Sequence, residues 1–252
     1  MKRAVVKTVR RLARNFGFDI SKKGEYPPDF SEEDIEIIKA VSPYTRTSPE
    51  RIYAVIQAIR YVVSCNIPGD IVECGVWRGG SMMAAAKTLL LLNQSDRHLY
   101  LYDTYEGMSE PTNDDIDYEG KRASVELAKD NKDFSEDSTW CYASVADVQK
   151  AMEQTGYDAS TIHLVKGKVE ETIPANTPES IAILRLDTDW YESTLHEMLH
   201  LYPRLVKGGV LLLDDYGHWV GAKKAVDQYI KENNLKLLLS RTDYTGRLAV
   251  KQ

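Results

Sequence analysis

Residues 69–93 read GDIVECGVWRGGSMMAAAKTLLLLN, a short apolar strand that passes through a glycine-rich turn into an alanine- and leucine-rich helix. The same alternation of short apolar strands and amphipathic helices continues to residue 233. Nearly continuous apolar strands separated by helices indicate an α/β protein whose parallel sheet is covered on both faces. Residues 235–252 differ, because two strands joined by a glycine-containing turn predict an antiparallel hairpin at the sheet edge.

The chain has 252 residues and is 43% hydrophobic, which suffices for one large α/β domain with an appendage. It contains no apolar run of 18 residues and no secretory leader, so we expect a cytoplasmic protein without a membrane span. Cys65, Cys74 and Cys141 lack CxxC spacing, which favours reduced thiols over disulfides or a zinc site. The net charge is −6, and such an acidic chain is not expected to bind nucleic acid.

Two parts are expected, a helical extension over residues 1–67 and a catalytic domain over residues 68–252. The extension starts with a basic amphipathic helix over residues 1–17. This helix either docks on the body or on a sister subunit, or it seeks an anionic membrane surface. A proline-containing linker then leads to two further helices, one capped by Ser31 and one capped by Ser48.

The loop after the first strand of the alternating region is glycine-rich and ends in a helix start. It contains an acid at the strand end, Glu73, followed by Gly75, Gly79 and Gly80, and Ser81 opens the helix. Glycines allow the sharp turn and the close approach of backbone that a ligand needs, and ligands of parallel sheets bind at this end of the strands. The spacing is neither GxGxxG nor GxxxxGK[ST], so no phosphate-binding design is indicated. A tight turn without a ligand is the alternative.

The second strand ends in Asp103, about 20 residues beyond the glycine loop. A carboxylate at this place can accept hydrogen bonds from both hydroxyls of a ribose. Together, the loop and the acid favour an adenosine-containing cofactor without a pyrophosphate.

Four aspartates follow the next two strands, Asp187 and Asp189 after the fourth, and Asp214 and Asp215 after the fifth. The ends of neighbouring strands lie about 5 Å apart, so these carboxylates converge if the strands are neighbours. Carboxylates that share a site must hold a proton or a cation. Arg185 lies two residues further inward, and an all-oxygen ligand set fits a hard divalent ion better. Helix capping by some of these acids is the alternative.

Four motifs in order, GDIVECGVWRGGSM, YDTYEGMSEP, LRLDTDWYEST and LLLDDYG, resemble those of the macrocin O-methyltransferase family. Members of this family use S-adenosylmethionine and Mg²⁺ to methylate sugar hydroxyls of antibiotics. The resemblance spans roughly residues 40–245. It implies a class I methyltransferase Rossmann-like sheet of order 3-2-1-4-5-7-6 with an antiparallel strand 7. It also implies a homodimer or larger homo-oligomer.

The resemblance also assigns site residues. It implies Mg²⁺ ligands at Asp187, Asp214 and Asp215 and a general base at Asp189. The cofactor-binding residues that it implies are Thr45, Glu73, Gly75, Trp77, Arg78, Gly79, Ser81 and Asp103. The stretch YTRT around Thr45 departs from the Thr-Met pair that is usual in the family.

Two further features bear on the acceptor. His218 follows the aspartate pair and is either an alternative base or substrate contact, or a surface or capping residue, whereas His196 lies in an amphipathic helix and is expected to be structural. Residues 106–120 are polar and too long for a simple connector, which predicts a lid over the acceptor or, alternatively, a mobile surface loop. The acids in this stretch, at 114, 115 and 117, are expected to be solvated.

The leading hypothesis is therefore an S-adenosylmethionine- and Mg²⁺-dependent O-methyltransferase that acts on a small glycoside or other vicinal diol. One alternative is a non-catalytic nucleoside- or glycan-binding protein on the same scaffold. An NAD-dependent oxidoreductase is a further alternative, which the absence of GxGxxG disfavours.

Overall fold

A seven-stranded sheet forms the centre of the computed structural model, which describes residues 26–130 and 138–252; the basic helix predicted over residues 1–17 lies outside these ranges. The strand order is β3-β2-β1-β4-β5-β7-β6, which confirms the predicted topology. Strands β1 to β5 run parallel, and β7 is antiparallel to both of its neighbours. The strands are β1 (Asp70–Cys74), β2 (Leu99–Asp103), β3 (Ile162–Lys166), β4 (Ile181–Leu186), β5 (Leu205–Leu213), β6 (Ser240–Arg241) and β7 (Arg247–Val250).

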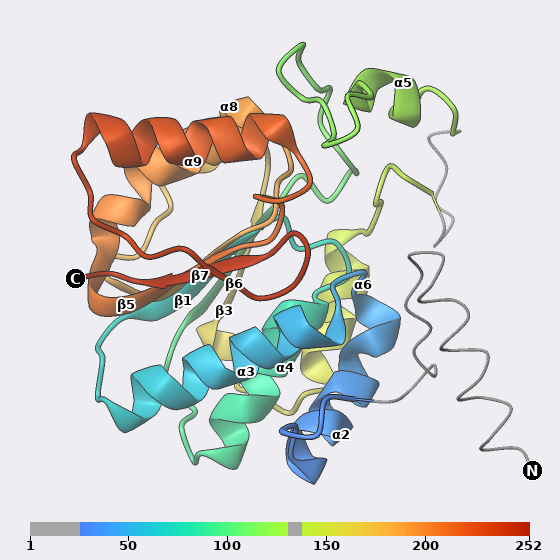
Figure 1. The fold of residues 1–252 in the computed structure, drawn as a ribbon. Helices are drawn as coiled ribbons and strands as arrows, with labels where there is room; N and C mark the ends of the chain where they lie inside the picture. The colour runs from blue at the N-terminus through green and yellow to red at the C-terminus, as the bar shows by residue number, and fades with distance from the viewer. Residues whose placement is uncertain (1–25, 131–137) are drawn as a thin grey trace, which may run out of the picture.

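Helices cover both faces of the sheet, as the apolar strands require (Figure 1). One face packs against α2 (Glu32–Val41), α3 (Pro49–Ser64), α4 (Gly80–Leu91) and α6 (Val145–Glu153). The other packs against α7 (Val169–Thr172), α8 (Tyr191–His200) and α9 (Val220–Glu232). The remaining elements are α5 (Ala123–Leu127) and the 3₁₀ turns η1 (Ser42–Tyr44), η2 (Ala159–Thr161) and η3 (Tyr202–Arg204).

The two described helices of the extension begin where the sequence predicts. The Ser31 hydroxyl accepts from the amide of Asp34, whose carboxylate accepts from the Ser31 amide in return, and this capping box starts α2. Ser48 caps α3, with Pro49 at its first position. Both helices bury apolar residues in the same cluster as the sheet, so this part of the extension is integral to the core.

The C-terminal hairpin is present but shorter than predicted. β7 pairs with β5 over four residues and with β6 over only two. The leucines before β6 form no strand; Leu235, Leu237 and Leu239 instead pack against the cluster on the α8–α9 face of the sheet, and Leu238 is exposed. Burial of alternate leucines there, without a strand partner, explains why apolar alternation alone predicted too long a strand.

The stretch after β2 is fixed to the body, and two of its acids are buried, so the expectation that all of them are solvated is wrong. Asp115 is 0% exposed, and its carboxylate accepts from the amides of Thr112 and Tyr191 at 2.6 and 2.8 Å. Asp117, also buried, forms a backbone bridge with Trp219. Of the three aspartates, Asp114 remains at the surface, where it pairs with a lysine of α9. The buried acids cap local amides, which is the usual fate of a buried carboxylate.

Within residues 26–130 and 138–252, no helix has the length and apolar character needed to cross a membrane. The carboxyl ends of β1, β2, β4 and β5 lie at one edge of the sheet, and the loops that follow these strands build the site.

Candidate active site

A cleft of about 280 Å³ opens at the carboxyl ends of β1, β2, β4 and β5. The extension, the glycine loop, the segment after β2 and the turn between β6 and β7 all contribute to its walls. Most of the predicted site residues line it, namely Thr45, Glu73, Gly75, Trp77, Ser81, Asp103, Asp187, Asp189, Asp214, Asp215 and His218. Arg78 and Gly79 do not line it. A site predicted from four separate motifs therefore becomes one continuous cleft.

Glycine is required where the β1–α4 loop touches its neighbours. Gly75 has φ +81°, and a Cβ added there would lie 1.9 Å from the carbonyl oxygen of Asp187. A Cβ on Gly80 would lie 2.6 Å from the Cβ of Thr45. The loop can therefore contact both the end of β4 and the segment before the core only because these side chains are absent.

Asp103 organises the glycine loop. Its carboxylate accepts from the backbone amides of Val76 at 2.7 Å and Trp77 at 3.0 Å, and from that of Tyr105 at 2.7 Å. Burial nevertheless raises the pKa of Asp103 above its ordinary value, and the backbone donors oppose this rise. The predicted ribose acid thus lies at the loop and contributes to its shape.

The segment before the core closes one side of the cleft. The Arg46 guanidinium lies 4.8 Å from the ring centroid of Trp77, and it donates to the carbonyl of Ser138 at 2.9 Å. Arg78 points away from the cleft and donates to the carbonyl of Pro43 at 3.1 Å. Arg46 and Arg78 therefore both tie this segment to its surroundings.

Arg185 joins the two halves of the site. Its guanidinium is buried and donates to Glu73 at 2.6 Å, to Asp187 at 2.5 Å and also to Asp214. The position of Arg185, two residues inward of Asp187, therefore does not keep its guanidinium away from the acids. Two residues of strand span only about 6.6 Å, and the extended arginine side chain covers this distance.

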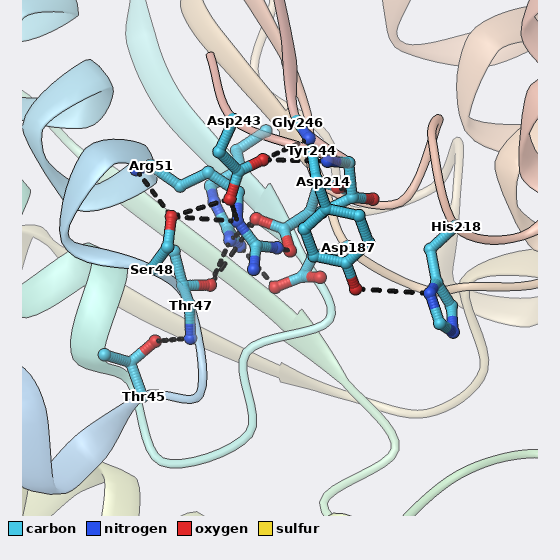
Figure 2. Close-up of polar contacts among 12 residues, drawn as sticks. Thr45, Thr47, Ser48, Arg51, Asp187, Asp214, His218, Asp243, Tyr244 and Gly246 are labelled. Atoms are coloured by element: carbon cyan, nitrogen blue, oxygen red, sulfur yellow. Dashed lines mark hydrogen bonds and ion pairs between the residues drawn. The ribbon is translucent and has the colours of Figure 1, made fainter. Parts of the chain in front are cut away.

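A second arginine reaches the acids from α3. Arg51 pairs with Asp214 and, at 3.0 Å, with Asp243 in the β6–β7 turn (Figure 2). Asp243 also accepts from the Ser48 hydroxyl at 2.7 Å. The two arginines neutralise part of the negative charge for which a divalent ion was the preferred partner. Together, they tie the extension and the C-terminal hairpin to the acid cluster, by which we mean Asp187, Asp214 and Asp215.

Glu73 and the Asp189–Asp215 pair show what burial does to carboxyl groups at this edge. Burial raises the pKa of Glu73 to about 8, although Arg185 opposes the rise. Asp189 and Asp215 share a side-chain hydrogen bond, and burial raises the pKa of Asp189 to about 7. Asp215 has a pKa well above its usual range, because burial and the charge of Asp189 both disfavour its ionised form. The two arginines therefore do not offset the full cost of ionising the carboxyl groups at this edge of the sheet.

The acid cluster also has the composition of a cation site. One carboxylate oxygen each from Asp187, Asp214 and Asp215 lies within 4.8 Å of the others, which is the only such group of three among residues 26–130 and 138–252. The Oδ2 atom of Asp215 is buried without a hydrogen-bond partner. Oxygen ligands without cysteine or histidine suit a hard cation such as Mg²⁺, so these residues fit the predicted ion.

The histidines differ in their surroundings. His218 lines the cleft, and its Nδ1 lies 3.2 Å from the hydroxyl of Tyr244. Burial lowers the pKa of His218, so its neutral form dominates at pH 7. His196 lies on α8 and contacts the carbonyl of Ile173 at 3.0 Å, away from the cleft, which agrees with a structural role.

Several residues of the site escaped sequence reasoning. Glu197 lies on α8 and is fully buried. It accepts a hydrogen bond at 2.9 Å from the hydroxyl of Thr188, which stands between Asp187 and Asp189 in the sequence. Burial raises its pKa well above the ordinary range. No pattern reveals this residue, since it occupies one position of an ordinary amphipathic helix. Arg51 and Asp243 were missed because they lie far from the acids along the chain.

Comparison with known proteins agrees with this geometry. Residues 39–250 match the family model described as macrocin-O-methyltransferase (TylF). The chain is 29% identical over 186 residues to demethyldecarbamoylnovobiocin O-methyltransferase of Streptomyces niveus. The aligned region covers 74% of this chain and 67% of the relative. It is 28% identical over 205 residues to a Streptomyces olivaceus 4'-O-methyltransferase of a tetracenomycin that carries a rhamnosyl group, covering 81% of this chain and 74% of the relative.

Solved structures share the fold. The O-methyltransferase NovP matches with a TM-score of 0.73 and 27% identity, over 83% of this chain and 82% of its own. TomG, an O-methyltransferase of Streptomyces achromogenes solved with S-adenosylmethionine, matches with a TM-score of 0.51 and 12% identity, over 89% of this chain and 91% of its own.

Proposed function

Because the chain belongs to the macrocin O-methyltransferase (TylF) family of S-adenosylmethionine-dependent enzymes, we propose that it methylates a hydroxyl group of a sugar or of another vicinal diol. The observation that carries this proposal is the shared cleft. The glycine loop and Asp103 line one part of it, and the acid cluster lines the other. A methyl donor and a hydroxyl acceptor can therefore meet inside one cavity.

The cofactor is assigned to the walls formed by β1 and β2. Glu73, Gly75, Trp77 and Ser81 surround the position proposed for its methionine part, and Asp103 that for its ribose. Thr45 would close over the cofactor from the extension. Arg78 and Gly79, which do not line the cleft, are proposed to act through the loop, Arg78 by holding the segment before the core and Gly79 by allowing the helix start at φ +88°.

The acceptor is assigned to the acid cluster. Asp187, Asp214 and Asp215 would hold Mg²⁺, which lowers the pKa of a hydroxyl bound to it and fixes its position. Asp189 lines the same cleft and is hydrogen-bonded to Asp215, so it is proposed as the group that accepts the hydroxyl proton. His218 is the alternative base. Correct positioning of the acceptor oxygen and the methyl group supplies a large part of the rate.

The wider setting is also a proposal. Residues 68–252 would form the methyltransferase domain and residues 1–67 its helical extension. The protein is proposed to be cytoplasmic, and the family resemblance implies a homodimer or larger homo-oligomer.

The test combines binding and turnover. Calorimetric titration with S-adenosylhomocysteine should show one site per chain, and labelled methyl transfer to a panel of vicinal-diol glycosides should require Mg²⁺ and stop in EDTA. Asp187→Asn should lose at least about 100-fold in turnover and keep its affinity for S-adenosylhomocysteine within threefold. Asp114→Asn, a surface carboxylate, serves as the control and should be unaffected. Full turnover in chelator, or in the Asp187 variant, would contradict the metal role, and stoichiometric NAD binding would favour an oxidoreductase.

A further inference from the structure

Three rings meet beside the acid cluster at the mouth of the cleft. Tyr118 comes from the stretch after β2, His218 from the loop after β5, and Tyr244 from the β6–β7 turn. The ring centroids of Tyr118 and His218 lie 5.5 Å apart, and those of His218 and Tyr244 lie 6.1 Å apart, both in edge-to-face arrangements. We call these three residues the aromatic rim.

The two tyrosines are exposed, and the backbone of the turns that carry them is held by hydrogen bonds. Tyr118 is 62% exposed and Tyr244 is 59% exposed. Beside Tyr118, the Asp117 carboxylate accepts from the amides of Glu119 and Lys121 at 2.9 and 2.8 Å. Such carboxylate-capped turns hold the backbone in one shape.

The turn that carries Tyr244 is built in the same way. The Asp243 carboxylate accepts from the amides of Thr245 at 2.9 Å and Gly246 at 2.7 Å. The Tyr244 hydroxyl also contacts His218 Nδ1 at 3.2 Å. A turn whose backbone is held before binding loses little conformational freedom when a ligand arrives, which favours affinity.

The aromatic rim is continuous with the acid cluster. His218 and Tyr244 line the same cleft as Asp187, Asp214 and Asp215. Figure 2 shows the Tyr244 hydroxyl directed toward His218, with Asp187 and Asp214 close by. An acceptor held at the acids by one hydroxyl can therefore reach the rim with the rest of its structure.

The chemistry of the rim selects the ligand. Tyrosine offers an apolar face and a polar tip, which suits a flat ring with polar substituents. The acid cluster attracts cations and hydroxyls, whereas burial lowers the pKa of His218, so the imidazole of the rim is neutral at pH 7. The two neighbouring surfaces thus match a molecule with a polyhydroxylated ring at one end and an apolar ring at the other.

We propose that Tyr118, His218 and Tyr244 form a subsite for a second, apolar ring of the acceptor, attached to the ring whose hydroxyl is methylated. This rests on the proposed function in one respect, that the hydroxyl-bearing ring is held at the acid cluster. In this arrangement His218 contacts the second ring of the acceptor, which leaves Asp189 as the proposed base.

The experiment compares two glycosides that differ only in the second ring, p-nitrophenyl α-L-rhamnopyranoside and methyl α-L-rhamnopyranoside. Dissociation constants are measured by calorimetry on the full chain with Mg²⁺ and S-adenosylhomocysteine. The wild type should bind the nitrophenyl glycoside at least about tenfold more tightly. Tyr118→Ala and Tyr244→Ala should each reduce this ratio about threefold to tenfold, in the range of aromatic pair energies, without weakening the methyl glycoside.

Controls separate the rim from folding and from the proposed function. Tyr118→Phe and Tyr244→Phe keep the ring faces and should keep the ratio, and Leu238→Ala removes an exposed apolar side chain elsewhere and should also keep it. Asp187→Asn should weaken both glycosides equally and leave the ratio unchanged. If the affinity for the methyl glycoside does not depend on Asp187, the proposed function fails. The ratio of the two dissociation constants still tests whether the rim binds the second ring. A ratio near one in the wild type, no binding of either glycoside, or an unchanged ratio in both alanine variants overturns the subsite.

Discussion

Replacement of Arg185 by methionine would remove the buried cation that joins the cofactor side of the cleft to the acid cluster. Its guanidinium is 4% exposed, and the variant would leave Glu73 and Asp187 without their arginine, while Asp214 would keep Arg51. Removing one partner of a buried ion pair costs about 3–5 kcal/mol. Because Asp214 remains paired, we expect the lower end, about 3 kcal/mol of unfolding free energy at pH 8.5.

The sign of the pH dependence follows from Glu73. Burial raises the pKa of Glu73 to about 8, so the folded protein binds a proton there that the unfolded chain releases above its ordinary pKa. This group therefore stabilises the fold at low pH, and its contribution declines as the pH rises through 8. Loss of Arg185 raises the pKa of Glu73 further and extends this decline to higher pH. The destabilisation should consequently be smaller at pH 5.5 than at pH 8.5.

Urea unfolding at both pH values measures the loss, with circular dichroism and tryptophan fluorescence required to give the same transition. Lys223→Met is the matched control, since it removes a cation from an exposed pair with Asp227 and should cost at most about 0.5 kcal/mol. Arg185→Lys keeps the charge without the planar fork and should fall between the two. If Arg185→Met costs no more than the control, or costs as much at pH 5.5 as at pH 8.5, the arginine does not neutralise the acids as argued.

Gly75→Ala should lower the calorimetric unfolding midpoint far more than Gly156→Ala. Both glycines have positive φ, but only at Gly75 would an added Cβ lie 1.9 Å from neighbouring backbone. Equal shifts of the midpoint would rule out the clash. Asp115→Ala should cost about 1–2 kcal/mol in urea unfolding through loss of amide caps, whereas exposed Asp114→Ala should change little, and similar values would contradict the capping role. Glu197→Gln should preserve stability at pH 6 and flatten its decline toward pH 9, because the raised pKa makes the native state take up a proton that the unfolded chain releases. An unchanged pH profile would show that Glu197 is ionised in the fold.

Sequence reasoning reached the features that depend on local pattern. Short apolar strands and intervening amphipathic helices predicted the parallel sheet, and serines before acidic first turns predicted the starts of α2 and α3. Convergence of Asp187 with Asp214 and Asp215 was predictable because parallel strands end at one edge. The family motifs then supplied the strand order.

Contacts between distant segments were out of reach. Arg51 is separated from Asp214 by more than 160 residues, and nothing in its own helix marks it as the partner of a buried acid. Asp115 was expected to be solvated because its neighbours are polar, although a buried position depends on what packs over it. Glu197 illustrates the same limit, since its burial follows from the packing of α8 against α9 and the sheet.

The backbone pairing of Asp117 with Trp219 bears on how acceptor preference could be re-engineered. A chimaera that transplants residues 108–122 from a relative would set a foreign segment against the original start of α9 at this pairing. Transfer of residues 108–122 together with residues 216–222 would move both segments of this backbone pairing at once. We therefore expect that acceptor specificity is transferred between such enzymes only when both segments are exchanged together.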